Sequence, residues 1–207
     1  MGLIKNKGEQ DILHKERKNE RNLAGLLEQL KDKDPETRCW AARDLASYPE
    51  SVSSLASVLA EETHLNVREA ILTSLTLIGG SEAVSELVKF LRSDDASIRN
   101  DVIEVMKSMP DAVAPIMSDL LTDADSDVRI FAIDILESLR HPHVEKWLID
   151  VILDDNHVNV CANAVNLLGE IGTDDALAPL KSLKEKFKSE PYIKFAVDMA
   201  VNKIQGN

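Results

Sequence analysis

The stretch Asp95-Ala96-Ser97-Ile98-Arg99 decides the fold, because versions of this phrase recur along the chain. Each version has an acidic residue or a histidine, two spacers, a β-branched residue and a closing residue that is most often arginine. The five other versions occupy residues 34–38, 64–68, 125–129, 157–161 and 190–194. Successive closing residues lie 30 to 33 positions apart, and this regularity indicates a tandem repeat.

A helix is expected directly after each phrase. Apolar residues return three, seven and ten positions after Arg68, at Ile71, Leu75 and Ile78, which is the period of one helix face. These helices, called helices B, end at turn-forming pairs at residues 48–49, 79–80, 109–110, 141–142 and 172–173. A preceding helix A is expected in each repeat, over residues 21–32, 49–61, 81–92, 110–121, 142–153 and 174–188. Each repeat is therefore two helices joined by a tight turn.

One such helix pair cannot bury its apolar face alone, so neighbouring pairs are expected to stack. The predicted fold is all-α: a right-handed α-solenoid, or α-α superhelix, of about six two-helix repeats. It is expected to form a single repeat domain over residues 21–207, preceded by a charged tail or capping helix over residues 1–20. Asp198 fits an exposed end, because the equivalent position is apolar in the other five repeats.

The composition excludes several partners. Asp and Glu number 36 against 24 Lys and Arg, and a net charge of −12 repels nucleic-acid phosphates, so no nucleic-acid partner is expected. No apolar run approaches the roughly 20 residues of a spanning helix, and the first residues lack a signal-peptide core. We therefore expect a cytoplasmic protein without a membrane partner. Cys39 and Cys161 are expected to be buried thiols in a reducing compartment, with a disulfide or redox pair as the alternative.

A pair of helices of about 30 residues, with Asp-x-x-Val/Ile-Arg opening the second helix, resembles the bacterial HEAT-like repeat family. That family includes the repeats first noticed in phycobilin lyases, and the resemblance covers about residues 21–205. It implies that the Asp and Arg are structural and form a ladder from repeat to repeat. The residues that match are Asp34, Arg38, Arg68, Asp95, Arg99, Asp125 and Arg129. Cys161 replaces the arginine, which puts the ladder in question in the fifth repeat.

The residues give no indication of catalysis, a cofactor or a metal. HEAT proteins that resemble deoxyhypusine hydroxylase bind iron through His-Glu dipeptides, and none of the five histidines here precedes a glutamate. The chain has no glycine-rich phosphate loop and no nucleophile elbow. The phrase Asp123-Ala124-Asp125-Ser126-Asp127 resembles half of a calcium loop but lacks its glycine and closing glutamate.

Helix geometry identifies an outer face on the helices B. At about 100° per residue, positions two, five and nine after the closing residue point away from the buried stripe. In HEAT repeats this edge lines the concave groove, which is the usual binding surface of a solenoid. The candidate protein-binding residues on this ridge are Trp40, Arg43, Thr73, Leu77, Asp101, Glu104, Phe131, Asp134, Asn163 and Asn166, and Ala70, Ala196, Met199 and Lys203 occupy equivalent positions.

Aromatic side chains beside carboxylates suit a partner segment that carries Lys or Arg next to an apolar residue. The alternative is that Trp40 packs under the N-terminal segment and that the acids are a solvated face. We therefore expect a non-catalytic scaffold or adaptor that binds a protein, within a bacterial signalling or regulatory assembly. A phycobilin-lyase-like enzyme or chaperone is one alternative, and a DNA-binding or base-excising solenoid, which needs a cationic groove, is another.

Overall fold

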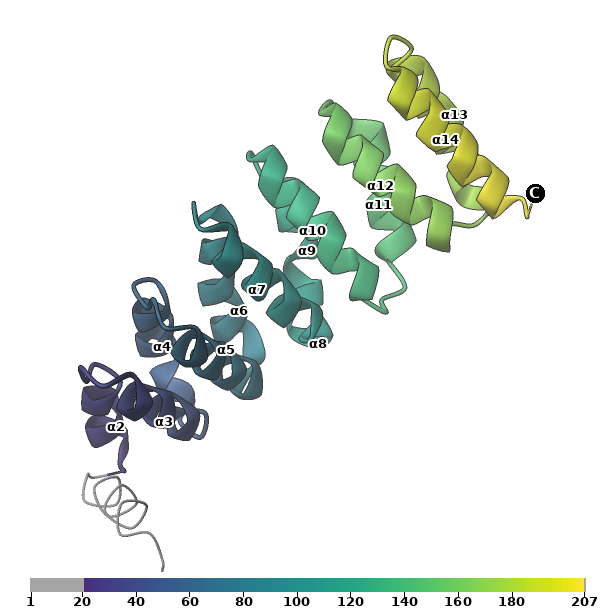
Figure 1. Cartoon of the computed structure of the whole chain (residues 1–207). Coiled ribbons are helices and arrows are strands. Elements are labelled where there is room, and N and C mark those ends of the chain that lie inside the picture. The colour runs from purple at the N-terminus through teal and green to yellow at the C-terminus, as the bar shows by residue number, and fades with distance from the viewer. Residues whose placement is uncertain (1–20, 207) are drawn as a thin grey trace, which may run out of the picture. The chain divides into compact units, whose positions relative to one another are not determined.

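The computed structural model describes residues 21–206 as helices joined by short loops, with no strand in that range (Figure 1). The all-α prediction is therefore confirmed. The predicted tail or capping helix at residues 1–20 lies outside the described residues. No helix within residues 21–206 is both long enough and apolar enough to span a membrane.

Every helix B begins immediately after the first residue of its phrase. The helices are α3 (Pro35–Leu45), α5 (Leu65–Ile78), α7 (Ala96–Lys107), α10 (Ser126–Ser138), α12 (Val158–Ile171) and α14 (Pro191–Ile204). In three of them the aspartate of the phrase is the N-cap, and its side chain accepts a hydrogen bond from the backbone N–H two residues later. Such a cap satisfies an N–H that has no partner inside the helix. The repeated phrase is therefore a helix-start signal.

The helices A are shorter than predicted and several begin or end in a 3₁₀ turn. They are α2 (Leu23–Gln29), α4 (Val52–Leu59) after η1 (Pro49–Ser51), α6 (Gly80–Lys89) before η2 (Phe90–Arg92), α11 (Val144–Asp154), and α13 (Leu177–Lys186) after η4 (Asp174–Ala176). The single helix predicted over residues 110–121 is wrong. The chain there forms α8 (Pro110–Val113), η3 (Ala114–Ile116) and α9 (Met117–Leu121), because Pro115 has no backbone N–H and interrupts a helix.

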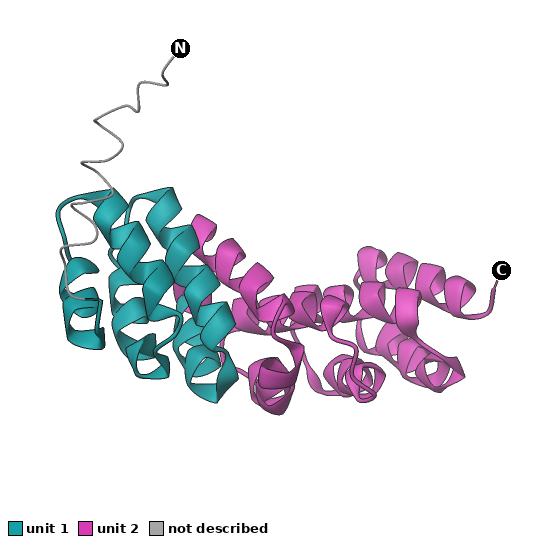
Figure 2. Ribbon diagram, turned by 90° about the horizontal axis from the view of Figure 1, so that it is seen from below, with its two compact units in different colours: residues 1–90 teal, residues 91–207 magenta. Residues whose placement is uncertain are grey.

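The helices divide into two compact units, the first ending at Phe90 and the second beginning at Leu91 (Figure 2). In unit 1, α2 packs on α3 and α4 on α5, while α3 lies against α5 and α4 against α6. In unit 2, α9, α11 and α13 pack on α10, α12 and α14, and the helices B stack in the order α7, α10, α12, α14. Like helices therefore stack on like helices within each unit, as in an α-solenoid. A single repeat domain over residues 21–207 stays a prediction.

The buried stripe of the helices B follows the predicted positions closely. The residues three after the closing residue are buried in all six helices, and those seven after it are buried in the first five. The tenth position is less well predicted, because Ile171 is 44% exposed at the end of α12. Asp198 is exposed, as predicted, and binds Lys184 at 2.6 Å.

Candidate functional site

Each of the first five loops between helix A and helix B is closed by a side chain two residues before the N-cap. That side chain accepts a hydrogen bond from the N-cap N–H and so shapes a tight turn. The pairs are Asp32 with Asp34 (2.8 Å), Glu62 with His64 (2.9 Å), Ser93 with Asp95 (3.2 Å), Asp123 with Asp125 (2.9 Å) and Asp155 with His157 (2.8 Å). This residue lies outside the repeated phrase and is not predicted from it, although an oxygen-bearing side chain recurs at that spacing.

The main-chain carbonyl of the same residue accepts a hydrogen bond from the closing residue of the phrase, six positions later. The donors are Arg38 to Asp32, Arg68 to Glu62, Arg99 to Ser93, Arg129 to Asp123, and the Cys161 thiol to Asp155 at 3.2 Å. The closing residue therefore holds the loop of its own repeat. In the fifth repeat the Cys161 thiol takes this position, and Lys186 Nζ donates to the same Asp155 carbonyl at 2.7 Å.

Two of the arginines also reach the next repeat. Arg38 binds Glu62 through Nε and Nη2 at 2.7 and 2.9 Å, and Arg129 binds Asp155 through Nε and Nη2 at 2.6 and 3.1 Å. The Arg38 hydrogen bonds lower the pKa of Glu62 from 4.5 to about 2 against the opposing effect of burial. Burial would raise the pKa of Asp155, but Arg129 and the His157 N–H lower it overall. These contacts join successive repeats through Glu62 and Asp155, and not through the aspartates that open the phrases, so the ladder of those aspartates stays a prediction.

The arrangement around Arg99 is different. Arg99 lies 5.9 Å from the ring centre of Phe131, and Asp123 is paired with Arg92 instead. The residues that resemble a calcium loop, Asp123 and Asp125, shape the turn instead. Each carboxylate accepts a backbone N–H from the residue two positions later. No group of three His, Cys, Asp or Glu within the described range is arranged to hold a metal ion.

The ten candidate ridge residues all keep solvent exposure. Trp40, Arg43, Thr73, Leu77, Glu104, Asn163 and Asn166 are exposed, while Asp101, Phe131 and Asp134 are half-buried. The placement of Ala70 and Ala196 on the same ridge is wrong, since both are buried. Trp40 and Asn163 at the same position are exposed, so the burial of the two alanines reflects the small size of a methyl group, which neighbouring side chains cover. The expected exposure therefore holds for the named candidates, and their binding role stays a prediction.

Unit 2 brings ridge residues of successive helices together. Lys107 Nζ lies 3.1 Å from the Glu104 carboxylate on its own helix and 2.9 Å from Asp134 on α10. Lys203 on α14 pairs with Glu170 on α12. In unit 1 the ridge contact is a stack, with the Arg43 guanidinium 5.2 Å from the Trp40 ring centre.

The ridge of unit 2 ends in an apolar hollow of about 210 Å³ between α12 and α14. Tyr192, Phe195 and Met199 line it and are 58%, 64% and 45% exposed. Asn166 and Lys203 lie in the same lining, so this hollow continues the predicted ridge. Large apolar side chains exposed together are uncommon on a monomer and mark contact surfaces.

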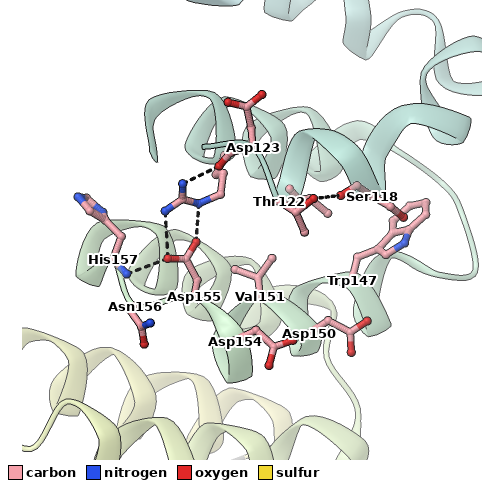
Figure 3. Close-up of a pocket in the computed structure, with 12 residues that line it drawn as sticks. Ser118, Thr122, Asp123, Trp147, Asp150, Val151, Asp154, Asp155, Asn156 and His157 are labelled. Atoms are coloured by element: carbon pink, nitrogen blue, oxygen red, sulfur yellow. Dashed lines mark hydrogen bonds and ion pairs between the residues drawn. The ribbon is translucent and has the colours of Figure 1, made fainter. Parts of the chain in front are cut away.

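A larger cavity of about 640 Å³ lies in unit 2 between α9 and α11, on the helices A (Figure 3). Its lining comprises Ser118, Leu121, Thr122, Asp123, Arg129, Trp147, Asp150, Val151, Asp154, Asp155, Asn156 and His157. No sequence motif predicts this cavity, because its lining comes from three helices, α9, α10 and α11, and from the loops between them. The signal available was Pro115, which shortens the helix on one side.

The fold and the stacked helix pairs define an α-solenoid protein. The profile of HEAT repeats matches residues 23–107 and 113–191, so the chain belongs to the HEAT-repeat family. The predicted family and the predicted solenoid class are thereby confirmed. Among the curated proteins, no sequence matches this one.

Solved structures support the fold. The archaeal HEAT-like repeats protein from Thermococcus onnurineus NA1 aligns with a TM-score of 0.50 and 16% identity, over 95% of this chain and 92% of that one. The third TOG domain of Drosophila melanogaster Mini spindles aligns with a TM-score of 0.56 and 18% identity, over 90% and 96% of the two chains. At these identities the likeness concerns the fold alone.

Proposed function

We propose that this protein is a non-catalytic scaffold or adaptor that binds a protein partner through the ridge on its helices B. The observation that carries the proposal is that seven of the ten candidate residues are exposed and three are half-buried, on helices whose opposite faces are buried. Within each unit the stacked helices B present such a face as a continuous surface, and HEAT-type solenoids generally bind proteins through it. We further propose that it acts in the cytoplasm, within a bacterial signalling or regulatory assembly.

The partner segment is proposed to be basic and apolar. In unit 2, Asp101, Glu104 and Asp134 lie on the ridge, while Lys107 is the cation that binds two of them. The net charge of −12 attracts cationic partners over a longer range and speeds their association. The hollow formed by Tyr192, Phe195 and Met199 supplies an apolar anchor at one end of that surface.

The aromatic residues of the ridge support a cationic partner as well. Arg43 lies over Trp40 and Arg99 lies near Phe131, so both rings have geometries that accept a guanidinium group. A partner arginine or lysine would compete with Arg43 and Arg99 for these ring faces and would also meet the neighbouring carboxylates.

The test is affinity capture from the native host, with wild type compared with a Glu104→Gln/Phe131→Ala variant. Partners that bind the ridge are expected to be lost from the variant and retained by the control Glu185→Gln, which removes an exposed carboxylate from helix A α13. Captured partners should then bind the purified chain more weakly as salt is raised. A set of partners that is the same for all three proteins would refute the ridge as the binding surface.

A further inference from the structure

We infer that the cavity between α9 and α11 is a second binding site, which takes an ammonium or guanidinium group carried on an apolar stem. The cavity lies on the helices A and shares no residue with the ridge on the helices B. Its volume of about 640 Å³ falls within the ordinary range of small-ligand sites, roughly 300–1,000 Å³. The proposal is therefore independent of the protein partner proposed above.

The floor and one wall of the cavity are apolar. Leu121 of α9 and Val151 of α11 are nearly buried, and the side chain of Val151 points toward α9 (Figure 3). Trp147 forms the wall, and its ring is held in place by His141, which stacks on it at 5.0 Å with an interplanar angle of 9°. His143 contacts the same ring edge-on at 5.8 Å. An indole that is fixed before a ligand arrives loses little entropy on binding.

The charges in the lining are unequal and favour a cation. Arg129 is already engaged by Asp155, and Asp123 is paired with Arg92. Asp150 and Asp154 lie at the rim farther from α9 (Figure 3), and neither makes an ion pair or a side-chain hydrogen bond with any described residue. The uncompensated charge of the cavity is therefore negative.

The position of these two carboxylates is unfavourable for the free protein. They are four residues apart on one face of α11, a spacing at which like charges repel. They also lie in the last turns of the helix, where the macrodipole disfavours negative charge. A bound cation relieves both costs at once. It would also lie near Trp147, whose indole face attracts organic cations more strongly than other aromatic side chains do.

A further polar group in the lining has no partner. The Nδ1 atom of His157 is buried and makes no hydrogen bond with any described residue. The imidazole of His157 points away from Trp147 and Asp150 (Figure 3), so this buried atom takes no part in the proposed site. The hydroxyl of Thr122 donates to the Ser118 carbonyl, which leaves recognition to the carboxylates and the indole.

The experiment uses the full chain with Trp40→Phe, so that Trp147 is the remaining tryptophan and its fluorescence reports the cavity. Phenethylammonium is the free probe, 2-phenylethanol is its neutral analogue, and an acetylated Phe-Lys amide presents an ammonium group on a peptide. We expect saturable quenching by the free ammonium, at least tenfold weaker binding of the alcohol, and weaker binding in high salt. The peptide arm tells whether the site accepts the cation from a free amine alone or also from a polypeptide.

Two double variants complete the test. Asp150→Asn/Asp154→Asn is expected to weaken phenethylammonium binding at least tenfold. Asp111→Asn/Glu185→Gln removes the same charge from exposed positions of unit 2 outside the cavity and is expected to change it less than twofold. Equal binding of the ammonium and the alcohol, equal loss in both double variants, or no saturable change in Trp147 fluorescence would overturn the proposal. Because the cavity shares no residue with the ridge and all of these proteins carry the same Trp40→Phe background, each result is separate from the test of the scaffold function.

Discussion

Arg38 and Glu62 form a nearly buried ion pair with two hydrogen bonds, Nε to Oε2 at 2.7 Å and Nη2 to Oε1 at 2.9 Å, between successive repeats of unit 1. Glu62 Oε1 also accepts the N–H groups of Thr63 and His64, and its carbonyl accepts from Arg68. One residue therefore connects two repeats and closes the loop that starts the second helix B. Loss of its charge should affect both functions of the residue.

The pair predicts a specific dependence of stability on pH. The Arg38 hydrogen bonds lower the pKa of Glu62 from 4.5 to about 2, so the folded state holds the charged form more tightly than the unfolded state does. The resulting stability is present above pH 4.5 and is lost as the pH falls toward 2. The shift corresponds to at most about 3 kcal/mol.

We expect Glu62→Gln to lower the free energy of unfolding at pH 7 by about 1–3 kcal/mol and to flatten its decline below pH 4.5. Urea unfolding at pH 7, 4.5 and 3 measures both effects. Glu61→Gln, at the exposed neighbouring position, is the matched control and should behave as the wild type does. Parallel loss of stability on acidification in wild type and Glu62→Gln would contradict the assignment.

The arginines of the repeated phrase should differ in their contribution to stability, although the sequence motif presents them as equivalents. Arg129→Ala leaves the largely buried Asp155 carboxylate without its cation, and we expect a cost of about 3 kcal/mol. Arg99→Ala removes a loop hydrogen bond and a contact with Phe131, and should cost about 1 kcal/mol. Chemical denaturation of the two variants measures the difference.

The double variant Arg129→Ala/Asp155→Asn distinguishes the contribution of the ion pair to stability from that of the hydrogen bond that closes the loop. Asparagine keeps an oxygen for the His157 N–H but carries no charge, so part of the stability lost in Arg129→Ala should return. If the double variant is less stable than Arg129→Ala, the penalty does not come from an unpaired carboxylate.

The sequence predicts the helices B well and the helices A less well, for physical reasons. A helix B starts at an N-cap, which is a local feature, and its stripe of apolar residues is long enough to define the period. In helix A of the fourth repeat, Pro110 favours a helix start, and the apolar pattern predicts that the helix continues to residue 121. Pro115 interrupts that helix in the structure. A proline five residues into a helix removes a backbone N–H donor, even where the apolar side chains keep the period of a helix.

The surfaces were predictable to different degrees. Exposure of ridge residues such as Trp40 and Leu77 follows from helix geometry alone, because it depends on the angle between a side chain and the buried stripe. The cavity at Trp147 depends on how far apart α9 and α11 lie, which is a tertiary distance. Ala70 and Ala196 show the limit of the angular argument, since neighbouring side chains cover a small residue at the edge of a stripe.

Gly172 is predicted to be required at the end of α12. A Cβ at this position would lie 2.5 Å from the Leu168 carbonyl oxygen, which already accepts the Gly172 N–H at 2.7 Å. Because the obstructing atom is backbone that terminates the helix, we expect Gly172→Ala to lower the free energy of unfolding by about 1–3 kcal/mol. Thermal unfolding of this variant, compared with Asn166→Ala on the exposed face of the same helix, measures the effect. Equal stability of the two variants would show that the helix end can shift to accommodate the methyl group.

The two thiols are predicted to react at very different rates. Both cysteines are free, and Cys161 is fully buried while Cys39 is partly exposed. Burial, with a contribution from the charge of Asp155, raises the pKa of Cys161 to about 11, so very little of it is the reactive thiolate at neutral pH. Ellman's reagent should therefore label one thiol of the native protein readily and the second only after denaturation. Cys39→Ser should remove the fast phase and leave the slow phase unchanged. A fast phase that persists in Cys39→Ser would contradict this prediction. It would mean that the loop before α12 opens often enough to expose Cys161, despite the hydrogen bonds from Lys186 to the Leu153 and Asp155 carbonyls.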